Sequence, residues 1–117
     1  MRIFKEYNFE AAHWLPNVPE GHQCGRMHGH SYRVVIQVEG DVDPRTGFVI
    51  DFADISKVMK PVINELDHST LNDLIPNPTA EKLALWIART VFIPGLASVE
   101  VWETATAGVV YDVPRNT

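Results

Sequence analysis

The sequence lacks several features that would set it apart from ordinary globular proteins. Among its 117 residues there is one cysteine, so no intramolecular disulfide can form, which suits a reducing compartment. The first ten residues include several charged side chains and no apolar run, so we expect no signal peptide. The most apolar stretch, Leu83 to Ala97, contains Arg89 and Pro94 and falls short of the roughly 18 apolar residues of a membrane span. We therefore expect a cytoplasmic protein that does not enter a membrane.

Positive charge is also scarce. Fifteen Asp and Glu residues against ten Lys and Arg residues give a formal net charge of −5. Because nucleic acids and anionic membranes are bound through basic surfaces, we expect neither as a partner. A local basic pocket for one anionic ligand remains compatible with this composition. The length and the ordinary share of hydrophobic residues, 45%, predict one folded domain over residues 1–117.

Hydrophobic periodicity predicts the order strand, strand, helix, helix, strand, strand. Alternating patterns indicate strands over 3–13 and 28–39, joined by a Pro- and Gly-containing loop over 15–27. Asp51 and Thr79 are typical N-caps of two helices, and Pro61 should kink or end the first. A hairpin is expected over 98–113. The prediction is an α+β fold with a four-stranded antiparallel sheet and two helices on one face. The other face is left to solvent or to a partner.

Three histidines fall at the predicted strand ends. His28 and His30 flank a glycine, and residues two apart in a strand point to the same side, about 6–7 Å apart. His13 ends the preceding strand, which should pair with the second strand and can supply a third nitrogen. Three neutral imidazoles on zinc leave one position open, as in catalytic zinc sites. The alternative is that His28 and His30 are surface residues with no metal.

Cys24 lies four residues before His28 in the predicted loop. It fits three roles: a small buried hydrophobe, a zinc ligand, or an accessible thiol that acts as a base. Asp67 and His68 lie between the predicted helices. A carboxylate beside an imidazole can orient a proton shuttle, but adjacent side chains seldom hydrogen-bond ideally, so a polar helix end is the alternative.

Glu103 continues a hydrophobic strand face that includes Val99 and Val101. An inward carboxylate needs a partner, because burying an unpaired charge is costly. A ligand with an amidine or guanidine edge would provide that partner through two hydrogen bonds. The alternative is a glutamate at the strand end that faces water.

Several of these motifs together resemble the 6-pyruvoyl-tetrahydropterin synthase family. The resemblance runs from about Phe4 to Tyr111, with the motifs in the family's order. They are Phe9-Glu10-Ala11-Ala12-His13, Cys24-Gly25-Arg26-Met27-His28-Gly29-His30, Ile50-Asp51-Phe52, Leu66-Asp67-His68, Leu71-Asn72 and Trp102-Glu103-Thr104. The Cys-x-x-x-His-Gly-His spacing is similar to the family's bacterial branch, which makes 6-carboxytetrahydropterin in the queuosine pathway.

The resemblance implies the tunnelling fold, in which four-stranded sheets join edge to edge into an oligomeric β-barrel. Trimers form such barrels, and two trimers commonly stack into a hexamer. Self-association would explain the uncovered sheet face. It would also place active sites between subunits, so that Asp67 and His68 could serve a neighbour's zinc.

The resemblance also implies a reaction. A zinc-dependent lyase of this branch converts 7,8-dihydroneopterin triphosphate and water to 6-carboxy-5,6,7,8-tetrahydropterin, acetaldehyde and triphosphate. The alternatives are a pyruvoyl-forming synthase, an aldolase that releases 6-hydroxymethylpterin, or a non-catalytic zinc-binding module. One departure from the family pattern is Trp14, where an arginine is expected after Ala-Ala-His, so the triphosphate-binding residues stay unassigned.

Residue roles follow from matching positions. His13, His28 and His30 would hold Zn²⁺, which coordinates the substrate's side-chain oxygens. Cys24 would be the base that moves the proton of the adjacent C–H group, and Asp67 would orient His68 as a second acid/base group.

The same matching places the pterin. Glu103 would bind its 2-amino and N3–H edge, and backbone groups from Thr104 to Thr106 would complete that pocket.

Overall fold

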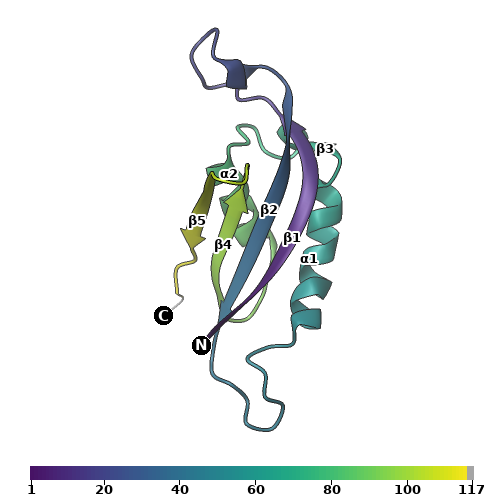
Figure 1. The fold of residues 1–117 in the computed structure, drawn as a ribbon, viewed down its shortest axis with the longest axis vertical. Helices are drawn as coiled ribbons and strands as arrows, with labels where there is room; N and C mark the ends of the chain where they lie inside the picture. The colour runs from purple at the N-terminus through teal and green to yellow at the C-terminus, as the bar shows by residue number, and fades with distance from the viewer. Residues whose placement is uncertain (116–117) are drawn as a thin grey trace.

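The computed structural model describes residues 1–115 as an elongated sheet with helices packed on one side (Figure 1). The loop after the first strand projects beyond one end of the sheet, and the loop after the second strand lies at the opposite end. In chain order the elements are β1 (Arg2–His13), η1 (Gln23–Gly25), β2 (His28–Glu39), α1 (Phe52–Leu66), β3 (Ser69–Thr70), η2 (Leu71–Asp73), α2 (Ala80–Thr90), β4 (Leu96–Trp102) and β5 (Gly108–Asp112). Within residues 1–115 no helix is long and apolar enough to cross a membrane.

The sheet has five strands in the order β3-β1-β2-β4-β5. The predicted α+β class is confirmed, and so is the antiparallel pairing of the four long strands. The predicted strand count of four is corrected by β3, which runs parallel to β1 and pairs Ser69 with Ala11 and Thr70 with Ala12. Within one chain the sheet is open, with β3 at one edge and β5 at the other.

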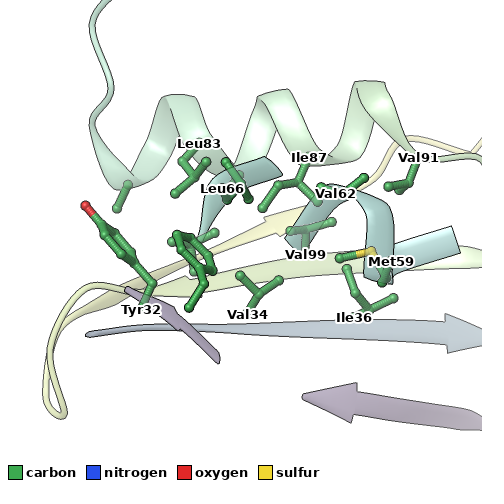
Figure 2. Close-up of a cluster of buried hydrophobic side chains, with 14 of the residues drawn as sticks. Tyr32, Val34, Ile36, Met59, Val62, Leu66, Leu83, Ile87, Val91 and Val99 are labelled. Atoms are coloured by element: carbon green, nitrogen blue, oxygen red, sulfur yellow. The ribbon is translucent and has the colours of Figure 1, made fainter. Parts of the chain in front are cut away.

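The core lies between the sheet and the two helices (Figure 2). Helix α1 contributes one stripe of buried side chains at helical spacing: Ile55, Met59, Val62 and Leu66. These side chains meet the helix-facing residues of β2 and β4, which alternate with residues of the other face. Both predicted caps are present, since the Asp51 carboxylate accepts from the Ala53 N–H at 2.8 Å and the Thr79 hydroxyl accepts from the Lys82 N–H at 3.1 Å.

Helix α1 runs through Pro61 and ends at Leu66, so the prediction that the helix ends at this proline is wrong. Proline removes the N–H that would donate to the Lys57 carbonyl, which normally costs a helix several kcal/mol. Pro61 itself is exposed, whereas the stripe from Ile55 to Leu66 is buried on both sides of it. Tertiary packing therefore holds the helix together across a locally unfavourable residue.

We predict that Pro61→Ala stabilises the protein by about 1–2 kcal/mol. The substitution restores one backbone donor to the helix, and the greater freedom of the unfolded chain offsets only part of that gain. Denaturant unfolding measures the difference. Lys60→Ala, at the exposed neighbouring position of the same helix, is the control and should change stability by less than about 0.5 kcal/mol. An unchanged or less stable Pro61→Ala variant would contradict the prediction.

Candidate metal centre

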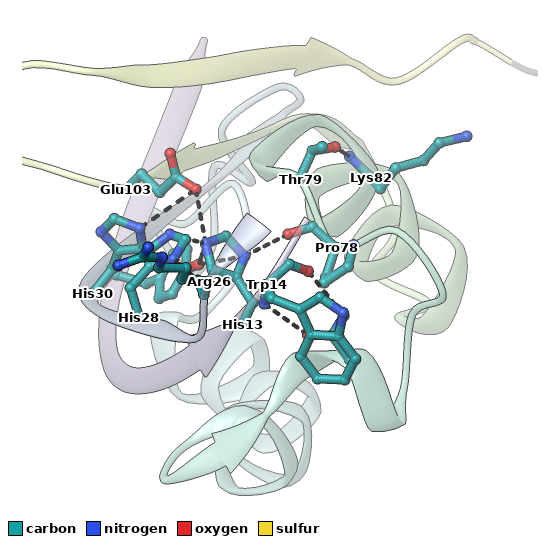
Figure 3. A network of polar contacts seen from close by, with 11 residues as sticks. His13, Trp14, Arg26, His28, His30, Pro78, Thr79, Lys82 and Glu103 are labelled. Atoms are coloured by element: carbon teal, nitrogen blue, oxygen red, sulfur yellow. Dashed lines mark hydrogen bonds and ion pairs between the residues drawn. The ribbon is translucent and has the colours of Figure 1, made fainter. Parts of the chain in front are cut away.

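Three histidines converge where β1 ends and β2 begins. The antiparallel register places His13 opposite His28, and His30 follows on the same face of β2. The Nε2 atoms of His13 and His28 are 3.0 Å apart, and one ring nitrogen from each of the three histidines lies within 4.8 Å of the others. Figure 3 shows the three rings turned toward one another beside Glu103. The sequence prediction that these three residues cluster is thus matched by the geometry.

Backbone carbonyls set the orientation of two of these rings. The Nδ1 of His13 lies 2.7 Å from the Pro78 carbonyl oxygen, and the Nδ1 of His28 lies 2.7 Å from the Arg26 carbonyl oxygen. A carbonyl can only accept, so each Nδ1 carries the proton and each Nε2 is left with a free lone pair. This is the arrangement in which metal-binding histidines are usually held.

His13 is fully buried, which favours its neutral form. Burial lowers the pKa of His13 below its ordinary value, and the Pro78 carbonyl offsets part of that effect. The buried Tyr32 hydroxyl lies 3.3 Å from the His13 Nδ1. Burial raises the pKa of Tyr32, so its hydroxyl keeps its proton. The buried groups at the centre therefore carry no charge of their own at neutral pH.

The donor set fits a divalent transition metal. Two nitrogens bound to one tetrahedral ion at 2.0–2.1 Å lie roughly 3.3 Å apart, close to the observed separation of the His13 and His28 Nε2 atoms. Neutral imidazoles suit zinc, copper, iron and nickel alike. The three histidines can hold such an ion with no rearrangement of the strands.

Glu103 comes directly after β4 and turns toward the histidines. Its Oε1 lies 3.5 Å from the His13 Nε2 and 3.8 Å from the His30 Nε2, and its side chain is 28% exposed. The carboxylate therefore neither faces open water nor sits in the core. It stands at the rim of the cluster, where it can contact a bound ion or a ligand beside the ion.

Thr104 and Thr106 belong to the turn between β4 and β5. The Thr104 hydroxyl accepts hydrogen bonds from the backbone N–H groups of Thr106 and Ala107, at 3.3 Å and 3.1 Å. The Thr104 side chain is thus occupied in forming the turn. Backbone groups are what this turn offers to a ligand next to Glu103.

Cys24 lies in η1 and is half-buried, and it is not one of the residues that converge with the histidine nitrogens. Its carbonyl accepts from the Leu15 N–H at 2.8 Å, which ties together the two ends of the loop over 15–24. Two residues later the Arg26 carbonyl contacts His28. The loop that carries Cys24 is therefore connected to the metal centre through its backbone.

Asp67 and His68 hydrogen-bond to each other, with the Asp67 Oδ2 2.9 Å from the His68 Nδ1. His68 has a φ of 56°, a left-handed conformation that is uncommon for residues other than glycine. The Glu10 N–H donates to the other Asp67 oxygen at 2.9 Å. This bond and the His68 contact lower the pKa of Asp67, so it stays a carboxylate that can orient the imidazole.

A groove of about 480 Å³ crosses β3, β1 and β2 and is lined by both His30 and His68. It brings the Asp67–His68 pair and the histidine cluster to neighbouring parts of one surface.

Three residues that contact the histidine rings, Pro78, Arg26 and Tyr32, were not predicted from the sequence to do so. Backbone carbonyls give no signal in a sequence, whereas Tyr32 continues the same-face alternation of His28 and His30 and was open to prediction.

Comparison with known proteins extends over nearly the whole chain. A sequence profile described as 6-pyruvoyl tetrahydropterin synthase matches residues 2–114. A Synechocystis protein named 6-carboxy-5,6,7,8-tetrahydropterin synthase is 43% identical, with 97% of this chain and 94% of that protein covered. A Pyrococcus furiosus dihydroneopterin monophosphate aldolase is 36% identical, with 92% and 94% covered. The structure of Caenorhabditis elegans 6-pyruvoyl tetrahydropterin synthase superimposes with a TM-score of 0.86 at 25% identity, covering 97% of this chain and 96% of that one.

We predict that His28→Ala lowers the zinc content from about one ion per chain to nearly none, because it removes one of three convergent nitrogens. Metal analysis after dialysis against zinc provides the measurement. His68→Ala is the matched control: this histidine is exposed and outside the cluster, so the variant should keep its zinc. Full zinc occupancy in His28→Ala would exclude the three-histidine site.

Proposed function

The chain belongs to the 6-pyruvoyl tetrahydropterin synthase family, and from this premise we propose that it is a zinc-dependent lyase acting on a pterin. The proposed reaction converts 7,8-dihydroneopterin triphosphate and water to 6-carboxy-5,6,7,8-tetrahydropterin, acetaldehyde and triphosphate, a step toward queuosine and other 7-deazaguanines. The observation that carries the proposal is the convergence of His13, His28 and His30 with Glu103 at their rim. The Synechocystis relative supports the choice of product.

A second candidate is aldolase-type cleavage that releases a hydroxymethylpterin. The Pyrococcus furiosus relative, which matches almost as much of the chain, favours it. Both reactions begin with a dihydroneopterin side chain at the same kind of site. They differ in which side-chain bond is broken, so product identity separates them.

His13, His28 and His30 would hold Zn²⁺. When bound, the ion would polarise the side-chain oxygens of the substrate and make the adjacent C–H group more acidic. The chain's own part is to keep these imidazoles neutral and oriented. The Pro78 and Arg26 carbonyls fix the protons of His13 and His28 on Nδ1, and the burial of His13 opposes a second proton.

Proton transfer falls to two groups in this proposal. Cys24, as the thiolate, would take the proton from the C–H group next to the side-chain oxygens and so become the thiol, and its place on a tethered, half-buried loop supports this role. His68 would move the second proton, and the Asp67 carboxylate orients its ring. In an assembly, this pair of one subunit can serve the site of a neighbour.

Glu103 is proposed to bind the pterin's 2-amino and N3–H edge with two charge-assisted hydrogen bonds. Its position supports this role, because the carboxylate stands at the rim of the cluster and a bound pterin would present its side chain to the histidines. Backbone groups of the turn from Thr104 to Thr106 complete the pocket.

We further propose that the chain works in the cytoplasm as one domain over residues 1–117, the last two of which lie outside the described residues. Its single cysteine suits that compartment. It would assemble as a homo-oligomer, with two stacked trimers forming a hexamer. The open edges at β3 and β5 support edge-to-edge joining of sheets.

The test of the function is a product analysis. Zinc-loaded protein is mixed with 7,8-dihydroneopterin triphosphate, acetaldehyde is trapped, and the pterin is identified by mass. We expect 6-carboxytetrahydropterin with one acetaldehyde per turnover. A hydroxymethylpterin would establish the aldolase reaction, a pyruvoyl product would indicate the sister synthase, and no turnover with zinc bound would indicate a non-catalytic module.

Cys24→Ala is the companion variant in the same assay. Removing the proposed base should lower the turnover number at least ~100-fold and leave about one zinc per chain. If the zinc is lost together with activity, Cys24 is a metal ligand and its assignment as a base is wrong.

For Glu103→Gln we predict much weaker pterin binding with unchanged zinc content. The amide keeps the shape of the side chain but cannot accept two charge-assisted bonds, so affinity should fall roughly 10- to 100-fold. Equilibrium binding of a non-reactive pterin to the zinc-loaded protein gives the comparison. Loss of zinc would instead make the carboxylate a fourth ligand, a result that its 3.5 Å distance from the His13 Nε2 makes worth testing directly.

A further inference from the structure

Residues 67–72, called the strap here, lie along the outer edge of β1 between Glu10 and Trp14. The strap begins with the Asp67–His68 pair and ends at Asn72, with the two-residue strand β3 between them. At its start the Asp67 carboxylate accepts from the Glu10 N–H, and the His68 N–H donates to the Glu10 carbonyl at 2.5 Å. In its middle, β3 pairs with β1.

Asn72 closes the other end with its side chain. Its Oδ1 accepts from the Trp14 N–H at 3.0 Å, and its Nδ2 donates to the Trp14 carbonyl at 2.9 Å. The carboxamide therefore engages both backbone groups of one residue, as a peptide group of a neighbouring strand would. Alternate residues of a strand present their backbone groups to the same side, so Trp14, directly after β1, continues the edge on which the backbone groups of Glu10 lie.

These contacts join two parts of the candidate site. His13 is the last residue of β1 and directly precedes Trp14, whose backbone groups are hydrogen-bonded to Asn72. His68 starts the strap that Asn72 terminates. A shift of the strap along β1 would move His68 relative to His13, and the two bonds to Trp14 oppose such a shift.

We propose that Asn72 is a positioning residue that fixes both the metal-ligating end of β1 and the place of His68. The proposal deepens the proposed function and rests on it for the roles of these two histidines. Neighbouring Leu71 is fully buried in the core and anchors the strap independently. The strap is therefore held to the core by Leu71 as well as to β1 by Asn72, and the two Asn72 bonds act on the alignment of the strap with β1.

The test compares Asn72→Ala with the wild-type protein. We expect zinc affinity, measured by chelator competition, to fall about tenfold, the lower end for groups that orient metal ligands. The visible absorption bands of the Co²⁺-substituted protein should change, because they report ligand geometry. The kcat for 7,8-dihydroneopterin triphosphate should fall with little change in KM. In the metal-free protein, the Trp14 amide should exchange with solvent at least ~10-fold faster.

Two further variants make the test specific. Asn72→Asp keeps an acceptor for the Trp14 N–H but sets a second carboxylate oxygen against the Trp14 carbonyl, so it should lower zinc affinity at least as much as Asn72→Ala, and it stands in if Asn72→Ala fails to fold. Asn64→Ala, on the exposed side of α1, is the matched control and should match the wild-type protein.

Wild-type zinc affinity and Co²⁺ spectrum in Asn72→Ala would overturn the proposal, even with lower turnover. Failure of the proposed function is distinguishable, because it would appear in the wild-type protein as absent turnover. The zinc and amide-exchange comparisons of the variants keep their meaning in that case.

Discussion

The site depends on the register of one pair of strands. β1 and β2 pair without a break from Arg2 and Glu39 at one end to His13 and His28 at the other. A slip of one residue would turn every side chain of a strand to the opposite face, taking His13 away from the other histidines and the core residues away from the helices. The hydrophobic core that fixes the register therefore also fixes the candidate metal site.

The location at the end of the core also determines the protonation state and the free ring nitrogen of the histidines. His13 is buried like a core residue, yet it stands at the last position of β1, where backbone carbonyls of loops are available. The Pro78 carbonyl, before α2, contacts His13, and the Arg26 carbonyl, before β2, contacts His28. Burial keeps the His13 imidazole neutral, and each carbonyl determines which nitrogen of its own histidine is free. A surface strand with the same His-Gly-His pattern would provide neither.

The sequence predicted the structure correctly wherever a single hydrophobic periodicity dominated a segment. The alternation over 28–39 predicted β2 at its observed bounds, and the positions of His13, His28 and His30 predicted their convergence. Sequence reasoning failed where a local rule competed with distant contacts. Pro61 predicted a kink or an end in α1, but the helix continues past it, because buried residues pack against the core on both sides of the proline. The left-handed backbone of His68, next to Asp67, has no signal in the sequence, and β3 has two residues, too few for a periodic signal.

The face of the sheet without helices bears on how subunits would join. Arg33 pairs with Glu6 at 3.1 Å and lies over the Trp102 ring, with its guanidinium carbon 4.7 Å from the ring centroid. The Glu100 carboxylate accepts from Gln37 at 3.0 Å and from the Trp102 indole at 3.1 Å. These polar groups already satisfy one another and would lose water if a second sheet packed on them. This cost opposes face-to-face packing over these residues. The same face also carries Phe4 and Val110, whose side chains are exposed, and covering them would favour a contact by burying apolar surface. The polar and apolar positions thus act in opposite directions on any contact made through this face.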